Sequence, residues 1–214
     1  MTKPYHTWLG QKIGETCIRN LNKHGFDAHW AEDRQGALEV ILGVAADCAT
    51  VGFGGSDTTR SLGLMEALKE RGKILYDHNA GGFNLTESLE CRRRQLSCDC
   101  FLCSANAVAM TGEIVNVDGV GNRTSAMAFG PGKVIIVAGI NKVTPDLDSA
   151  IKRVRQVAAP MRARSLGMKT PCAETGICID CNSPQRICNI TTILHRKPMM
   201  TAVSVVIVNQ QLGY

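Results

Sequence analysis

Apolar positions along the chain recur with two periods, one typical of amphipathic helices and one typical of buried strands. Leu9, Ile13, Cys17 and Leu21 follow one another at intervals of four, which predicts a helix over residues 5–24. Similar patterns, together with capping residues, predict four more helices along the chain. These lie at residues 33–46, 58–71, 85–97 and 146–164.

Short, continuously apolar runs separate the helices and predict strands. VIIVAGI (134–140) and AVSVVIV (202–208) are the longest, and they suit a parallel sheet, whose strands are buried on both faces. The predicted strands lie at 26–31, 49–53, 73–76, the start of 98–109, 113–118, 133–139 and 201–209. Strands that alternate with helices predict an α/β fold with a mostly parallel sheet covered on both faces.

Composition narrows the class of protein. A chain of 214 residues with 44% hydrophobic and 20% charged residues fits one domain, 1–214. The first residues lack the layout of a signal peptide and the apolar runs are too short to span a membrane, so we expect a cytoplasmic location. The net charge of +5 is modest and the basic run Arg92–Arg94 fits a solvated helix face, so nucleic-acid binding is not expected.

A glycine-rich turn, VGFGGSDTTRSLG (51–63), follows one predicted strand and precedes a helix. The carboxyl ends of strands are where α/β sheets place ligands, and the glycines let the backbone approach one closely. The candidate ligand-binding residues here are Gly54, Gly55, Ser56, Asp57 and Thr58. The alternative is a tight turn with a helix cap, because the turn matches neither a Walker loop nor GxGxxG.

A second polar cluster lies at residues 116–142. Its candidate ligand-binding residues are Asn116, Asp118, Asn122, Arg123 and Lys142. Arg123 could hold a carboxylate or phosphate as a bidentate fork, and Lys142 could hold one as a point charge. The alternative interpretation is a hairpin turn at Asp118–Gly119 and a strand-end loop at Asn141–Lys142.

Four of the ten cysteines fall within CAETGICIDCNSPQRIC (172–188), in a segment, 170–190, that reads as an insertion before the last strand. Cys172, Cys178, Cys181 and Cys188 have the spacing C-x5-C-x2-C-x6-C, which matches neither the usual zinc knuckles nor the ferredoxin repeat. Grouped thiolates in a reducing compartment favour a metal or cluster site. A reversible Cys178/Cys181 dithiol and four unrelated buried thiols are the alternatives.

Two long stretches resemble a known family. The pairing of GFGGSDTTRSLGL with TGEIVNVDGVGNRTSAMAFGPGKVIIVAGINKVTPDLDSAIKRVR resembles the lactate-utilisation (LUD) domain family, and TPCAETGICIDCNSPQRIC resembles its cysteine-bearing branch. The resemblance implies a three-layer α/β fold similar to ribose-5-phosphate isomerases and CoA transferases. It also implies a link to bacterial growth on lactate, and favours a 4Fe-4S cluster over zinc on the four cysteines.

The chain departs from the family pattern at Cys98, Cys100 and Cys103, where members usually carry small or β-branched residues. Strand geometry predicts Cys98 and Cys100 on one face and Cys103 on the other, with small thiols filling the core. A second metal site that includes Cys91 is the less favoured alternative.

Catalytic residues do not carry over from this resemblance. Glu87 and Glu113 do not align with the glutamate of the CoA transferases. Asp118 and Lys142 come nearest to the acid and lysine of the isomerases, but their spacing assigns them no role.

Three hypotheses follow. The first is a LUD-type protein that binds a small anionic ligand and an iron–sulfur cluster or other metal, as a redox component of lactate or related organic-acid oxidation. The second is a non-catalytic subunit whose structural zinc knuckle docks onto an iron–sulfur or flavin redox partner. A homo-oligomer is compatible with both of these hypotheses. The third, by fold analogy alone, is a sugar-phosphate isomerase or an acyl-CoA enzyme. Whether the chain is an enzyme stays open at this stage.

Overall fold

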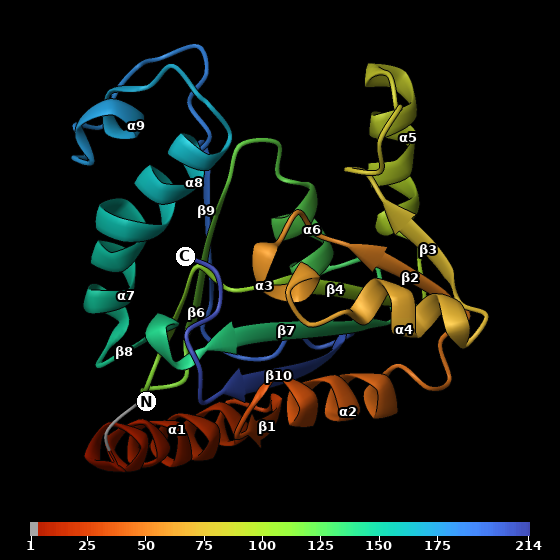
Figure 1. The fold of residues 1–214 in the computed structure, drawn as a ribbon, viewed down its shortest axis with the longest axis vertical. Coiled ribbons are helices and arrows are strands. Elements are labelled where there is room, and N and C mark those ends of the chain that lie inside the picture. The colour runs from red at the N-terminus through yellow and green to blue at the C-terminus, as the bar shows by residue number, and fades with distance from the viewer. Residues whose placement is uncertain (1–3) are drawn as a thin grey trace.

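A six-stranded, all-parallel sheet forms the centre of the protein, whose computed structural model describes residues 4–214. The strand order is β1-β10-β7-β4-β2-β3, so the two longest apolar runs, in β7 and β10, are neighbours near the middle (Figure 1). The strands are β1 (Asp27–Ala31), β2 (Thr50–Phe53), β3 (Ile74–Asp77), β4 (Cys100–Ser104), β7 (Lys133–Gly139) and β10 (Ala202–Val208).

Helices cover both faces of this sheet and make a three-layer α/β fold, as expected. On one face, Cys17 and Leu21 of α1 (Pro4–Lys23) and Met127 of α6 (Asn122–Ala128) pack against the sheet. On the other face, α2 (Arg34–Val44) and α4 (Leu64–Glu70) supply the core. The strands supply both cores because successive side chains point to opposite faces.

A smaller sheet, of order β8-β5-β6-β9, stands beside the large one. Its strands are β5 (Ala107–Ala109), β6 (Ile114–Asp118), β8 (Val143–Thr144) and β9 (Ile190–Leu194). Gly112 has a φ of 108° in the tight turn between β5 and β6, a left-handed conformation that glycine adopts without strain. The face of this sheet is covered by α7 (Leu147–Arg153).

Three predicted elements are interrupted in the structure. The helix predicted over 58–71 is two helices, α3 (Asp57–Arg60) and α4, because Gly63 between them has a φ of +66°. The strand begun in 98–109 is two strands, β4 and β5, in different sheets. The helix predicted over 146–164 continues from α7 through a π-helical turn (Val154–Ala158) into α8 (Ala159–Ser165).

Two short elements next to or within the cysteine segment are absent from the sequence-based prediction. The first is β9, which pairs with β6, so a strand separates the cysteine segment from β10. The second is α9 (Pro171–Thr175), which begins the cysteine segment. None of the helices in residues 4–214 combines the length and apolar character needed to cross a membrane.

The cysteines around β4 are buried, as expected, but one of the predicted faces is wrong. Cys98 and Cys103 belong to the core on the α1 face, whereas Cys100 belongs to the core on the α2 face. The alternation fails for Cys98 because the strand begins only at Cys100. Burial raises the pKa of Cys98 to about 11 and that of Cys103 to about 12, so both remain thiols at neutral pH.

Candidate functional site

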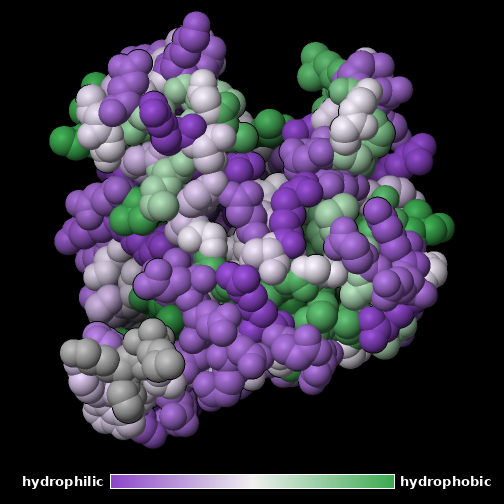
Figure 2. Space-filling view, viewed as in Figure 1, coloured by the Kyte–Doolittle hydropathy of each residue, from purple (hydrophilic) through white to green (hydrophobic). Residues whose placement is uncertain are grey.

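The carboxyl ends of the parallel strands open into a cavity of about 360 Å³, here called the carboxyl-end cavity. The segments that follow β2, β3, β4, β7 and β10 all contribute to it, together with α6 and α8. The protein surface is hollowed between the part formed by α8 and α9 and the part formed by α5 (Leu85–Gln95), with many hydrophilic residues in the hollow (Figures 1 and 2).

Most of the predicted ligand-binding residues meet in this cavity although they lie far apart in the sequence. Those that line it are Gly55, Ser56, Asp57, Thr58, Asp118, Asn122, Arg123 and Lys142. The remaining two predicted residues, Gly54 and Asn116, are not among the lining residues. Asn116 instead accepts a hydrogen bond from the backbone N–H of Asn106 at 3.0 Å.

The glycine-rich turn both caps a helix and forms a cavity wall. Ser56 accepts a hydrogen bond from the backbone N–H of Thr59 at 3.2 Å and thereby caps α3, which confirms the cap considered as the alternative. A Cβ atom on Gly54 would lie 3.1 Å from Cβ of Cys103, so glycine allows this turn to approach β4. The carboxylate of Asp57 lies 3.6 Å from Arg162 of α8, which offsets its negative charge.

Arg123 and Asp118 form a nearly buried ion pair in the cavity wall. Nε and Nη2 of Arg123 donate to Oδ1 of Asp118 at 3.0 and 2.8 Å, and Nη1 donates to the carbonyl of Ser104 at 2.8 Å. The other oxygen of Asp118 accepts from the N–H of Thr124 at 3.0 Å. The guanidinium of Arg123 is therefore occupied by these contacts and is not free to bind a ligand in a bidentate way. Asp118, which is paired on both oxygens, does not suit the role of a general base.

The turn after β6 differs from the hairpin considered as the alternative. Asp118–Gly119 leads from β6 towards α6, and β6 pairs with β5 and β9 rather than with the segment that follows it. Asn122 is the first residue of α6.

Lys142 lies at the buried end of the cavity, in a short 3-10 helix (Ile140–Lys142) that follows β7. Its Nζ donates to Oγ of Ser104 at 2.8 Å, to Oγ1 of Thr58 at 3.0 Å and to the carbonyl of Ala105 at 3.3 Å. All three acceptors are uncharged. Burial is the main reason that the pKa of Lys142 is lowered to about 7, and the neighbouring Arg153 and Arg123 contribute to this shift.

Sequence reasoning missed two basic residues of the cavity, Arg92 and Arg162. The sequence predicts a solvated face for the run of arginines at 92–94, which holds for Arg93 and Arg94 but not for Arg92. Nε of Arg92 is buried and has no hydrogen-bond partner within residues 4–214. Only the helical period could have signalled this difference, because it turns the three side chains in different directions.

The four cysteines of the segment 170–190 are partly exposed free thiols. Burial raises the pKa of Cys188, and the nearby Cys178 and Cys181 contribute to the rise, so these three lie within electrostatic reach of one another. The loop around them is held by Arg186, which donates to the carbonyls of Cys181 and Cys188 and pairs with Asp180 at 2.8 Å.

The donor atoms of this segment are suitable for a metal, but their arrangement is not. In residues 4–214 no group of three or more histidine, cysteine, aspartate or glutamate side chains is placed to hold a metal ion. Four thiolates would converge on one centre only after the loop rearranged.

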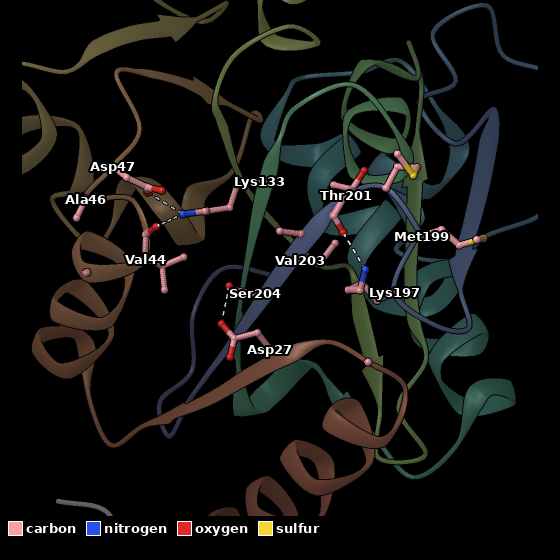
Figure 3. Close-up of a pocket in the computed structure, with 14 residues that line it drawn as sticks. Asp27, Val44, Ala46, Asp47, Lys133, Lys197, Met199, Thr201, Val203 and Ser204 are labelled. Atoms are coloured by element: carbon pink, nitrogen blue, oxygen red, sulfur yellow. Dashed lines mark hydrogen bonds and ion pairs between the residues drawn. The ribbon is translucent and has the colours of Figure 1, made fainter.

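A larger cavity, of about 640 Å³, lies at the opposite edge of the same sheet and is here called the amino-end cavity. Its charged side chains are paired with one another, with the backbone or with a serine hydroxyl (Figure 3). Lys133 donates to Asp47 at 2.8 Å and to the carbonyl of Val44 at 2.7 Å, and Asp27 accepts from Ser204 at 2.9 Å. This arrangement leaves little unsatisfied charge for a ligand.

The fold and the site define a class: an α/β protein with a basic cavity at the carboxyl ends of its parallel strands. The model of the LUD domain family matches residues 14–208, so the chain belongs to the LUD domain family, which is associated with lactate utilisation.

One solved structure shares the fold. It is the crystal structure of a DUF162 family protein from Deinococcus radiodurans, with a TM-score of 0.52 and 14% sequence identity over 94% of this chain and 98% of that chain. At this identity the likeness shows a common fold alone. None of the curated proteins matches the chain.

Proposed function

We propose that the protein binds a small carboxylate or phosphate ligand in the carboxyl-end cavity, in support of lactate or related organic-acid oxidation. The observation that carries the proposal is the charge of the cavity wall. Of the lining side chains, four are basic (Arg92, Arg123, Lys142 and Arg162) and two are acidic (Asp57 and Asp118). Basic side chains in a partly enclosed cavity attract anions more strongly than they would in water.

Arg92 and Arg162 are the two basic groups best able to contact the ligand. Arg123 is engaged by Asp118 and by backbone carbonyls, whereas Arg92 donates from Nη1 to Ser88 of its own helix and keeps a buried Nε–H without a partner in the described residues. An unsatisfied buried donor is unfavourable, and an anion would satisfy it. Arg162 is held only loosely by Asp57, at 3.6 Å.

The test is ligand titration by calorimetry with lactate, pyruvate and inorganic phosphate as probes. A hydrogen bond to a charged group contributes about 1.5–3 kcal/mol, so Arg92→Met should weaken binding by about ten- to a hundredfold. Arg93→Met is the matched control, since Arg93 lies on the same helix but pairs with Glu90 at the surface. Equal affinity of the two variants, or no binding of any probe, would contradict the proposal.

The redox part of the proposal rests on the cysteine segment. We propose that the loop closes around a 4Fe-4S cluster or zinc through Cys172, Cys178, Cys181 and Cys188, and that it faces an iron–sulfur or flavin partner protein. The grouping of the four thiols and the family membership support this proposal. Iron, zinc and acid-labile sulfide measured on protein purified without oxygen, beside a Cys178→Ser/Cys181→Ser variant, test it. An equal metal content in the two proteins would contradict it.

A further inference from the structure

Ser104 and Lys142 bring a hydroxyl and an amine together at the buried end of the carboxyl-end cavity. Ser104 is the last residue of β4, and Lys142 follows the adjacent strand β7. Oγ of Ser104 lies 2.8 Å from Nζ of Lys142, and both residues line the cavity although they are only 3% and 4% exposed. The distance is suitable for proton transfer between a nucleophile and its base.

The charges that face Lys142 favour its neutral form. Arg153 of α7 and Arg123 of α6 oppose a positive charge on Nζ, and they act more strongly than Asp57 of α3, which favours it. Cys103 of β4 also faces Nζ, but it is an uncharged thiol at neutral pH. With burial as the largest cause, the pKa of Lys142 is about 7. A substantial fraction of the side chain is therefore an uncharged amine at neutral pH and can accept a proton.

The backbone of Ser104 is fixed by contacts that do not involve its side-chain oxygen. Its carbonyl accepts from Nη1 of Arg123 at 2.8 Å, and its strand pairs in register with β7. Its Oγ also lies 3.4 Å from Oγ1 of Thr58, which accepts a hydrogen bond from Nζ of Lys142 as well. The hydroxyl is thus held between the base and the cavity, as positioning for attack requires.

We propose that Ser104 and Lys142 form a serine–lysine dyad that cleaves an ester or thioester of a small carboxylic acid. This inference rests on the proposed function for the anionic part of the substrate. It goes beyond that function in assigning a covalent step to the cavity. Serine–lysine pairs are a known variant of the serine nucleophile, in which the lysine acts as the base.

The step balances with water as the only co-reactant. Lys142 accepts the hydroxyl proton while Oγ of Ser104 forms a bond to the carbonyl carbon. The tetrahedral intermediate then breaks its bond to the leaving oxygen or sulfur, which takes the proton from Lys142. Water attacks the acyl-serine through the same proton path, so the ester and water become an acid and an alcohol, or an acid and a thiol.

The test uses an uncharged fluorophosphonate, which phosphonylates activated serines, with intact mass and peptide mapping as the readouts. We expect one adduct per chain, on Ser104, and none in Ser104→Ala. General-base catalysis contributes about 10²- to 10⁴-fold, so Lys142→Met should slow labelling at least about a hundredfold. The rate in the unaltered protein should rise with pH to about 7 and then level off.

Two controls keep the outcome clear. Ser204→Ala removes a serine of the amino-end cavity and should label at the rate of the unaltered protein. Arg93→Met, which alters a surface residue paired with Glu90, should also label normally. Because the probe carries no anion, labelling reports on the dyad alone, whereas the calorimetric titration reports on anion binding. No adduct, an adduct on another serine, or equal rates in folded Lys142→Met would overturn the proposal. Mapping the adduct in the unaltered protein needs no variant to fold.

Discussion

The two cavities lie at opposite edges of one sheet, yet they differ in the state of their polar groups. The amino-end cavity is the larger, about 640 Å³ against 360 Å³, but its lining acids and bases pair with one another and with the backbone. The carboxyl-end cavity is smaller and keeps a surplus of basic groups, one of which has a buried N–H without a partner among the described residues. Unsatisfied polar groups, rather than volume, are what mark a binding site.

The two lysines show the contrast most sharply. A hydrogen bond to Asp47 raises the pKa of Lys133, whereas burial lowers the pKa of Lys142 from 10.5 to about 7. Between pH 7 and 10.5 the unfolded chain therefore holds a proton on Lys142 that the folded protein has lost. For this residue, stability rises as the pH rises above 7.

The largest expected effect follows from this difference. Relative to Lys142→Met, the unaltered protein should gain about 1.4 kcal/mol in free energy of unfolding per pH unit above 7, up to about 5 kcal/mol in all. Lys133→Met should show no such slope between pH 7 and 9, because a raised pKa leaves Lys133 charged in both states. Urea unfolding at several pH values measures both. A flat difference for Lys142→Met would contradict the burial argument.

The second expected effect concerns the two ion pairs. Arg123→Met leaves the carboxylate of Asp118 buried without its partner, which should cost about 3–5 kcal/mol. Lys133→Met leaves Asp47 in water, since its side chain is 79% exposed, so the loss should be much smaller. Urea unfolding at pH 7 compares the two variants. Similar losses would show that the cavities are less different than their contacts indicate.

The smallest expected effect concerns one glycine in each cavity. Gly213 has a φ of +60°, and a Cβ atom there would lie 2.5 Å from Oγ1 of Thr58, so Gly213→Ala should cost about 1–2 kcal/mol. It should also slow labelling of Ser104, because the methyl group would lie 3.3 Å from Nζ of Lys142. A Cβ atom on Gly43, in α2, would meet no atom of another described segment within 4 Å, and Gly43→Ala should stabilise by about 0.5 kcal/mol. Thermal unfolding with the labelling rate checks both variants.

Much of the fold could be predicted because local patterns carry it. The apolar runs of β7 and β10 and the four-residue spacing in α1 each identify their element without any distant contact. The wrong or missing predictions concern features that depend on contacts with segments distant in the sequence or on where a strand begins. Cys98 faces the other core because β4 begins after it, and β9, at ITTIL, is defined by its pairing with β6.

The candidate site divides in the same way. The glycine-rich turn and Asp118, Arg123 and Lys142 were identified because each follows a predicted strand of the chain. Arg92 and Arg162 were missed because they belong to helices, and the composition of a helix does not predict how it is oriented towards the cavity.

By itself, the sequence determined the α/β class, the parallel sheet and most of the residues at its carboxyl edge, because these depend on the period of apolar residues and on strand ends. Only the tertiary structure decided that Lys142 is buried against Ser104 and that Arg123 is paired with Asp118. It also decided that Nε of Arg92 has no hydrogen-bond partner within residues 4–214. The physical reason is that charge and reactivity depend on burial and on partners distant in the chain, and both exist only once the layers have packed.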